Sequence, residues 1–331
     1  MGEYFKKKMI NLLKQVQTYL TGLAVSKSRQ ENKAVLKRFQ GCLLGLAAGD
    51  ALGTSLEFQP KGSFTPITDM CGGGIFSLKA GQWTDDTSMA LCLAASLVEC
   101  HGFQADDQMQ RYCQWWRHGY MSSTGTCFDI GNTVRRALQH FEKTGEAFAG
   151  SNDPQSAGNG SIMRLAPVVL WFYPSLDDMV HYAVESSRTT HAAPECLDAC
   201  RLMARILYRA LQGKSKQQVL FADAERFTGE ARIVALAKGE YQSLSEAGIH
   251  GTGYVVQSLE AALWCFYHSE SYKEAVLMAA NLGDDADTTA AICGQIAGAY
   301  YGLEGIPQSW QNQLAMREEL MVWAGRLYKS A

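Results

Sequence analysis

Residues 41–52 read Gly-Cys-Leu-Leu-Gly-Leu-Ala-Ala-Gly-Asp-Ala-Leu, a run of small and apolar residues. A second run, Asp85–Val98, is rich in Ala and Leu, and neither run alternates polar and apolar residues as a half-buried strand does. The sequence therefore predicts an all-α fold, built as one compact multi-helix domain. Further helices are predicted over Asn132–Glu142, Leu176–Ser187, Pro194–Leu211, Thr252–Tyr267, Tyr272–Ala280, Thr288–Tyr301 and Pro307–Leu327.

The composition is that of a globular protein. The chain has 331 residues, of which 47% are hydrophobic and 19% are charged, and this excludes disorder over most of its length. No stretch reaches 18 apolar residues without a charge, so no transmembrane helix is predicted. The ten cysteines form no Cys-x-x-Cys pair, which predicts buried thiols in a reducing cytoplasm and no zinc site.

The first 37 residues differ from the rest of the chain in charge. Residues 1–40 hold nine Lys or Arg against two Glu, whereas the whole chain has a net charge of -3. We predict a basic amphipathic extension over residues 1–37 and a separate globular domain over residues 38–331. The extension fits a helix packed on the domain, a docking segment for an acidic protein or a membrane-surface helix. Nucleic-acid binding is not expected, because the rest of the chain is acidic.

Two short acidic segments each precede an apolar helix. One is Trp-Thr-Asp-Asp-Thr-Ser at residues 83–88, and the other is Gly-Asp-Asp-Ala-Asp-Thr-Thr at residues 283–289. Either alone fits helix capping, since carboxylates and hydroxyls accept bonds from the free N–H groups of a first turn. Together they offer more carboxylates than two caps need. If the two helix starts converge, they form an oxygen-rich site for Mg²⁺ or Mn²⁺, and Asp285 and Asp287 share it only at an irregular helix entrance.

Six motifs, in this order, resemble those of the ADP-ribosylglycohydrolase family, over most of the chain from about Phe39 to about Gly302. They are Gly41–Gly53 leading to Glu57, Trp83–Thr87, Asp129–Thr133, Gly158–Arg164, Thr190-His191 and Gly283–Thr289. One such motif would carry little weight, because glycine clusters also serve sharp turns. The resemblance implies an all-α fold with a binuclear centre of two Mg²⁺ or Mn²⁺ ions.

The resemblance also implies roles for individual residues. Asp284 lies one position early and is expected to cap or support the metal ligands. Glu57 and Asp129 match positions that activate or orient the attacking water. The expected metal ligands are Thr84, Asp85, Asp86, Asp285, Asp287 and Thr288. The expected substrate-binding residues are Asn132, Ser156, Gly158, Asn159, Gly160, Ser161 and His191.

The implied activity is metal-dependent hydrolysis of the bond between ADP-ribose and a modified protein side chain, with arginine as the expected acceptor. Such a bond breaks through an oxocarbenium-like transition state, which a carboxylate and a bound metal can assist. Two alternatives stay open: a binding module for ADP-ribose or a toxin, and a hydrolase of a related ADP-ribose small molecule. Some relatives resemble immunity proteins, so residues 1–37 are a candidate contact for an ADP-ribosyltransferase toxin.

Overall fold

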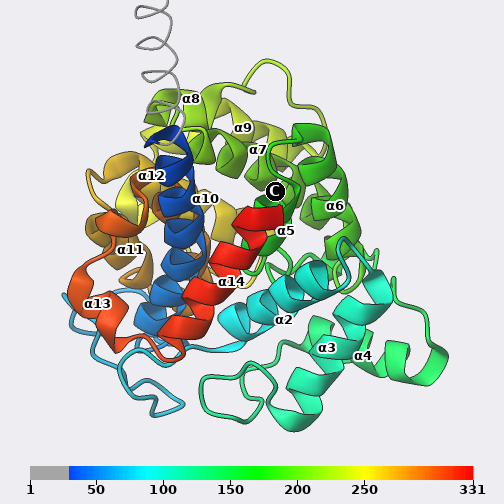
Figure 1. Ribbon diagram of the computed structural model, residues 1–331. Helices are drawn as coiled ribbons and strands as arrows, with labels where there is room; N and C mark the ends of the chain where they lie inside the picture. The colour runs from blue at the N-terminus through cyan, green and yellow to red at the C-terminus, as the bar shows by residue number, and fades with distance from the viewer. Residues whose placement is uncertain (1–29, 331) are drawn as a thin grey trace, which may run out of the picture.

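The computed structural model describes residues 30–330, and within them the chain is helical (Figure 1). Its extended segments form isolated bridges rather than strands, so over these residues the predicted all-α fold is confirmed. Residues 1–29, which hold most of the predicted basic extension, lie outside the described residues. Residues 30–37 belong to a helix that continues to residue 53, so the predicted boundary at residue 37 falls inside a helix.

The described helices follow one another with short connections. After the helix over residues 30–53, they are α2 (Asp85–Glu99), α3 (Ala105–His118), α4 (Asn132–Thr144), α5 (Ala166–Phe172), α6 (Leu176–Arg188) and α7 (Pro194–Leu211). The second half of the chain contains α8 (Lys216–Phe221), α9 (Ala231–Lys238), α10 (Val255–His268), α11 (Tyr272–Ala280), α12 (Ala286–Tyr301), α13 (Gln308–Gln313) and α14 (Arg317–Ser330). Four short 3₁₀ turns lie at Pro154–Ser156, Glu240–Ser243, Glu246–Gly248 and Leu303–Gly305.

Helix 30–53 and α12 pack antiparallel and unusually close, because small residues face each other along both. A Cβ atom at Gly41, Gly45, Gly49 or Gly53 would collide with backbone carbonyl oxygens of α12. Those oxygens belong, in reverse order along α12, to Gly298, Gly294, Ala290 and Ala286. Such a seam lets two backbones touch without intervening side chains. It fixes the end of helix 30–53 against the start of α12, where both acidic motifs lie.

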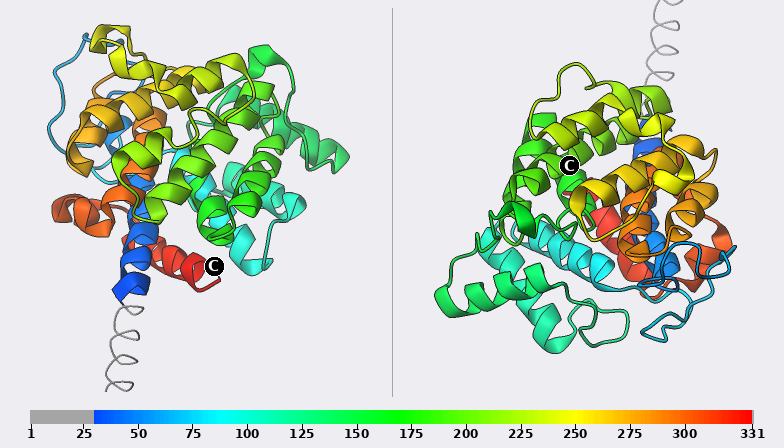
Figure 2. Two further views of the ribbon diagram at one scale, coloured as in Figure 1. Left: turned by 90° about the horizontal axis from the view of Figure 1, so that it is seen from above. Right: turned by 180° about the vertical axis from the view of Figure 1, so that it is seen from behind.

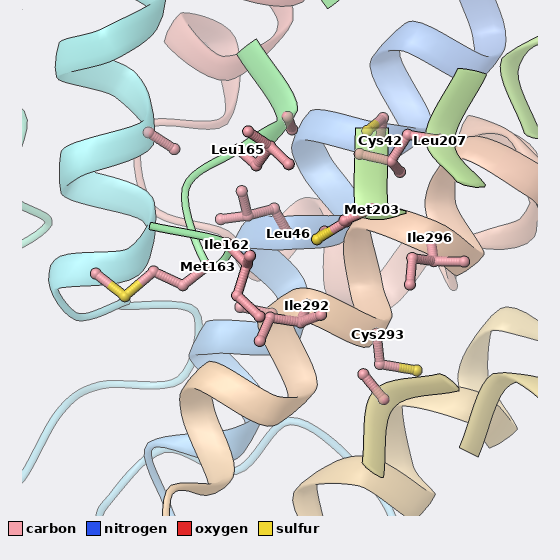
Figure 3. Close-up of a cluster of buried hydrophobic side chains, with 14 of the residues drawn as sticks. Cys42, Leu46, Ile162, Met163, Leu165, Met203, Leu207, Ile292, Cys293 and Ile296 are labelled. Atoms are coloured by element: carbon pink, nitrogen blue, oxygen red, sulfur yellow. The ribbon is translucent and has the colours of Figure 1, made fainter. Parts of the chain in front are cut away.

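Around this pair of helices the apolar side chains form one continuous core. Figure 3 shows a part of it in which Leu46, Met163, Met203 and Ile292 come from four different segments of the chain. All ten cysteines are free thiols, and six of them are buried, whereas Cys71 is exposed, contrary to the expectation for that residue. Within residues 30–330 no helix is long and apolar enough to cross a membrane.

One prediction of helix extent was wrong, and four helices of the described residues, α3, α5, α8 and α9, were not predicted. The predicted helix Pro307–Leu327 is two helices, α13 and α14, because the chain turns between them: Met316 has a φ of +46° and the Ala315 N–H donates to the Gly81 carbonyl. Helix α3 was not predicted, since its sequence is mostly polar and it buries only Gln108, Met109, Tyr112 and Trp115. The views in Figure 2 show α3 and α4 side by side at one end of the molecule.

Candidate active site

The two acidic motifs meet at the end of helix 30–53. The Thr84 hydroxyl lies 2.9 Å from Asp50 Oδ1, 2.9 Å from Asp86 Oδ2 and 3.0 Å from Asp287 Oδ2. All four residues are buried, and the three carboxylates come from helix 30–53, α2 and α12. A hydroxyl has one proton and can donate to only one of three acceptors. The remaining short oxygen contacts are unfavourable unless a proton or a cation lies among them.

Asp50 is a site residue to which the sequence analysis gave no role. Its carboxylate accepts hydrogen bonds from the backbone N–H and the hydroxyl of both Thr84 and Thr87, over 2.6–3.0 Å. Asp50 thereby fixes the start of α2 against helix 30–53. Burial raises the pKa of Asp50 to about 6, although the hydrogen bonds from Thr87 and Thr84 oppose that rise. The sequence signal that could have identified Asp50 is that it is a single carboxylate inside an apolar helix.

A second group of carboxylates adjoins the first and shares Asp287 with it. Ligand atoms of Glu57, Asp129 and Asp287 lie within 4.8 Å of one another, as do those of Asp50, Asp86 and Asp287. The two groups therefore form two adjacent triads joined by one residue of α12. Asp129 adopts a left-handed backbone conformation with a φ of +57°, which is unfavourable for a non-glycine residue and is often found at functional sites.

Crowding of these carboxyl groups favours their protonated forms. Burial, followed by the charge of Asp129, raises the pKa of Glu57 to about 10. Burial, followed by the charge of Asp285, raises the pKa of Asp129 to about 7. The pKa values of Asp85, Asp86 and Asp287 also lie well above the ordinary value, with burial as the main cause in each case. A bound divalent cation would reverse this preference, because it stabilises the ionised carboxylates.

The donor set fits a divalent metal ion. Glu57 Oε2, Asp86 Oδ1 and Asp287 Oδ1 are buried and have no hydrogen-bond partner within residues 30–330. Buried carboxylate oxygens without partners are costly, and hard oxygen ligands are those that Mg²⁺ and Mn²⁺ prefer. The acidic cluster is therefore compatible with metal binding on the evidence of its unpartnered atoms.

Capping does not account for the acidic motifs. The N-cap residues of α2 and α12 are Thr84 and Asp285, and neither makes a side-chain hydrogen bond to its own first turn. Asp129 does not cap α4 either, since the N-cap residue there is Gly131. Asp285 has non-helical backbone angles, whereas Asp287 lies in the first turn of α12. The α12 motif thus has the irregular entrance that its spacing required.

Above the triads lies a cleft of about 670 Å³. Of the predicted metal ligands, Asp85, Asp285 and Thr288 line the cleft, whereas Thr84, Asp86 and Asp287 lie beneath it. Asp285 accepts a 2.7 Å hydrogen bond from the Asn159 side-chain amide, which joins the acidic motif of α12 to the glycine segment Gly158–Gly160. Glu57 and Asp129 line the same cleft.

The opposite wall of the cleft offers hydrogen-bond donors. Residues Gly131–Val134, at the start of α4, line it, and α4 carries neither a side-chain cap nor an acidic residue in its first turn. The N–H groups of Gly158 and Asn159 donate to Ser156 and Gly253 carbonyls. Among residues 30–330, no partner is found for the N–H groups of Gly160 and Ser161. Free N–H groups and the helix dipole make this wall suitable for an anion.

The predicted substrate-binding residues are divided among three places. Asn132, Gly158, Asn159, Gly160 and His191 line the cleft. Ser156 instead lines an adjoining pocket, which meets the cleft at Thr133, Gly158 and Gly253. The Ser161 side chain points into the protein and lies 3.5 Å from the Cys200 thiol, and Ser161 is not among the residues that line the cleft. His191 is buried, and burial lowers its pKa to about 3, so that its ring is neutral.

Phe58 and Asp284 form part of the cleft wall and were not predicted to contact substrate. Both have left-handed backbones, with φ values of +60° and +54°. They are joined because the Phe58 N–H donates to the Asp284 carbonyl and the Asp284 N–H donates to the Gln59 carbonyl, at 2.7 and 2.8 Å. The Phe58 side chain is 60% exposed, although it is large and apolar. These hydrogen bonds hold the Phe58 ring in solvent beside Asp284 in the cleft wall.

Comparison with known proteins agrees with this geometry. The family model described as ADP-ribosylglycohydrolase matches residues 31–331. A Pseudomonas putida protein named ADP-ribosylarginine hydrolase is 45% identical over 296 residues, which cover 89% of this chain and 79% of that protein. A Rhodospirillum rubrum protein named ADP-ribosyl-[dinitrogen reductase] glycohydrolase is 31% identical, over 86% of this chain and 93% of that one. A solved structure titled ADP-ribosylglycohydrolase-related protein complex superposes with a TM-score of 0.80 at 41% identity, over 90% of this chain and 99% of the other.

Proposed function

The chain belongs to the ADP-ribosylglycohydrolase family of glycosyl-bond hydrolases, and from this premise we propose that it removes ADP-ribose from arginine side chains of modified proteins. The observation that carries the proposal is the division of the cleft into two chemically different ends. Carboxylates crowd the part that we call the acidic end, which contains Glu57, Asp85, Asp129 and Asp285. Uncharged donors line the part that we call the donor end, which consists of Gly131–Val134, Gly158–Gly160 and His191. An ADP-ribosylated arginine has matching halves, because its diphosphate is anionic and its guanidino group is basic.

We propose that two divalent cations, Mg²⁺ or Mn²⁺, bind at the acidic end. The unpartnered oxygens of Asp86 and Asp287 and the triad of Asp50, Asp86 and Asp287 support one site. Asp85, Asp285 and Thr288, which line the cleft, are proposed to form the adjacent site with Asp287. The proposed ligands are Thr84, Asp85, Asp86, Asp285, Asp287 and Thr288, to which the geometry adds Asp50. When bound, such ions polarise sugar hydroxyls and lower the pKa of a coordinated water.

Glu57 and Asp129 are the proposed acid–base pair. Each has a raised pKa, and their carboxyl groups lie close enough to share one proton. Water adds to the anomeric carbon as the C–N bond to the guanidino nitrogen breaks. The pair takes the proton that the water loses and returns a proton to the departing nitrogen, so that free ADP-ribose and arginine result.

The diphosphate is proposed to lie against the donor end. There the free N–H group of Gly160 and the uncapped first turn of α4 supply backbone donors. His191 adds a side-chain donor, and Asn132 lies beside it in the cleft wall. Backbone N–H groups and a helix N-terminus suit phosphate without a Lys or Arg side chain, which matters because none of the residues that line this cleft is Lys or Arg.

The acceptor half is proposed to lie at the mouth of the cleft, which the exposed Phe58 lines together with Asp284, with Glu57 and Asp129 in the same lining. A guanidinium group is stabilised both by carboxylates and by the face of an aromatic ring. A serine acceptor would leave these groups without a partner. This chemistry supports arginine as the acceptor, in agreement with the names of the most similar relatives.

The experiment is a turnover assay on proteins ADP-ribosylated at arginine or serine and on O-acetyl-ADP-ribose, each with Mg²⁺, with Mn²⁺ and with a chelator. We expect release of ADP-ribose from arginine that requires a divalent ion. Release of ADP-ribose from serine alone, or from O-acetyl-ADP-ribose alone, would show that arginine is not the acceptor. Binding of ADP-ribose without any turnover would favour a binding module instead.

For the basic segment we propose a protein partner, an ADP-ribosyltransferase toxin of acidic surface, in a cell that the enzyme protects. The support is its charge, since nine Lys or Arg lie within residues 1–40. Helix 30–53 also begins with exposed residues at 30–34, where the segment joins the catalytic domain proposed for residues 38–331. Deletion of residues 1–29 should abolish capture of the toxin and leave release of ADP-ribose unchanged. Equal capture by both forms would remove this part of the proposal.

A further inference from the structure

Arg164 is a fully buried charge without a carboxylate partner. Its relative exposure is 0%, and among residues 30–330 no Asp or Glu pairs with its guanidinium group. The group lies over the ring of Tyr112 at 4.7 Å, approaches the Met89 sulfur at 3.9 Å and leaves its Nε without a partner. A guanidinium group stays protonated at any physiological pH, and burying it unpaired is destabilising. The fold therefore keeps at this position a charge that its own packing does not need.

Arg164 has one strong hydrogen bond, and that bond leads to the cleft. Its Nη2 donates to the Thr190 hydroxyl at 2.6 Å, and the same hydroxyl lies 2.8 Å from His191 Nδ1. Arg164 can only donate to this hydroxyl, and among residues 30–330 His191 Nδ1 is the one acceptor within its reach, so we assign the hydroxyl proton to the bond with Nδ1 of the neutral imidazole. Nδ1 then accepts, and the ring proton resides on Nε2. The three side chains form a chain of donors that runs from the core toward the cleft.

The Nε2 edge of His191 faces the glycine segment of the donor end. A Cβ atom at Gly160 would collide with His191 Cε1 and Nε2, and one at Gly158 would lie 3.4 Å from Nε2. Glycine at these positions leaves room for the ring beside the free N–H groups of Gly160 and Ser161. The His191 N–H therefore joins the backbone donors in one group.

The acidic lining of the cleft is unfavourable for an anionic diphosphate, and the buried charge of Arg164 offsets this effect. Its lining includes Glu57, Asp85, Asp129, Asp284 and Asp285 but neither Lys nor Arg. An anionic diphosphate is repelled by such a lining, and cations at the acidic end lie at only one side of it. The buried charge of Arg164 acts through a region of low dielectric, where its field is weakly screened.

We propose that Arg164 and Thr190 are positioning residues for the diphosphate: Thr190 fixes His191 with its proton on Nε2, and Arg164 supplies the compensating positive charge from inside the core. This inference rests on the proposed function, since it takes ADP-ribose as the ligand. The ligand itself completes the charge pair that the protein leaves open. Neither residue touches the ligand, so both act through His191 and the donor end.

Four variants test the proposal, each as the full chain with Mg²⁺. Arg164→Met removes the charge at similar volume, and Thr190→Val removes the hydroxyl at similar shape. Thr190→Ser keeps the hydroxyl and is the rescue. Arg209→Met is the matched control, because Arg209 is paired with Asp223 at 2.7 Å and lies outside the cleft lining. The measurements are the Kd of ADP-ribose by calorimetry and the ¹⁵N shifts of the His191 ring.

We expect the Kd of ADP-ribose to rise about tenfold in Arg164→Met and about fivefold in Thr190→Val, in line with loss of a charge-assisted and a neutral hydrogen-bond contribution. Thr190→Ser and Arg209→Met should bind as the wild type does. The ring proton should reside on Nε2 in the wild type and move partly to Nδ1 in Thr190→Val. An unchanged Kd in Arg164→Met and Thr190→Val, or a wild-type proton on Nδ1, overturns the proposal. Failure of the wild type to release ADP-ribose from arginine would overturn the proposed function instead.

Discussion

The two ends of the cleft satisfy their polar groups in opposite ways. At the acidic end, the Thr84 hydroxyl lies within hydrogen-bond distance of three carboxylates but can donate to only one of them. Three buried carboxylate oxygens there have no hydrogen-bond partner among residues 30–330. At the donor end, Thr190 links Arg164 to His191 through two hydrogen bonds, and the free groups are N–H donors. Among the described residues, the acidic end has no positive charge to balance its carboxylates, and the donor end has no acceptor for its free N–H groups. The comparison teaches that each end is completed by a different part of what binds: cations at one, phosphate oxygens at the other.

The largest expected effect follows from breaking the acidic end at Asp287, which belongs to both triads. Asp287→Asn should lower kcat about a thousandfold, since metal-assisted charge stabilisation amounts to several kcal/mol. The metal-free variant should unfold at no lower urea concentration than the metal-free wild type, because burial and neighbouring carboxylates already disfavour the ionised side chain. Asp177→Asn, an exposed carboxylate in the first turn of α6 that lies outside the cleft lining, is the control. Wild-type turnover in Asp287→Asn would contradict two metal sites joined at this residue.

A change in the helix seam should affect the acidic end through the backbone. Gly49→Ala places a Cβ against the Ala290 carbonyl oxygen, and relief of this overpacking moves α12 away from helix 30–53. We expect a loss of about 1–3 kcal/mol in the free energy of unfolding, together with weaker Mg²⁺ binding. The control is Gly325→Ala on α14, where no atom lies near the added methyl group and helix propensity should raise stability by about 1 kcal/mol. Urea unfolding and metal titration compare the two, and unchanged metal affinity in Gly49→Ala would show that the seam does not set the site.

The donor end should have its own pH signature through His191. The folded pKa of about 3 lies below the ordinary value of 6.5, so this neutral histidine contributes its full stability above pH 6.5 and loses it as pH falls toward 3. Between pH 7 and pH 5 the stability difference between wild type and His191→Gln should shrink by about 2 kcal/mol. The Thr190 hydroxyl contacts the ring, and Arg164 lies behind it. A difference that stays constant with pH would mean that the folded histidine takes up a proton normally.

The smallest effect is expected at the cleft mouth. Phe58→Leu keeps an apolar side chain but removes the aromatic face, and we expect a three- to tenfold rise in KM for ADP-ribosylarginine with little change in kcat. Phe58→Tyr should restore KM. Phe148→Leu is the matched control, because Phe148 is also an exposed phenylalanine and lies outside the cleft lining. An equal rise in the inhibition constant of free ADP-ribose would place Phe58 on the nucleotide half and contradict the acceptor assignment.

Several features of the fold and the site were predictable because they are local. The apolar runs identified most helices, since burial of a helix face leaves a periodic pattern in the sequence. Polar helices such as α3 escaped, because a narrow buried stripe resembles a surface segment. The break at Met316 was also missed, because a tertiary hydrogen bond to Gly81 rather than any local signal ends α13.

The sequence by itself determined the helical class, the two acidic motifs and the glycine segment, because these depend on residue type and short-range spacing. Only the tertiary structure decided that Asp50 joins the acidic end, that the Ser161 side chain lies against Cys200, and that Arg164 lies behind His191. Each of these depends on contacts between residues far apart in the chain. For Asp50 the cause is the close approach of helix 30–53 and α12, which brings polar groups distant in the chain together in a space where water cannot separate them.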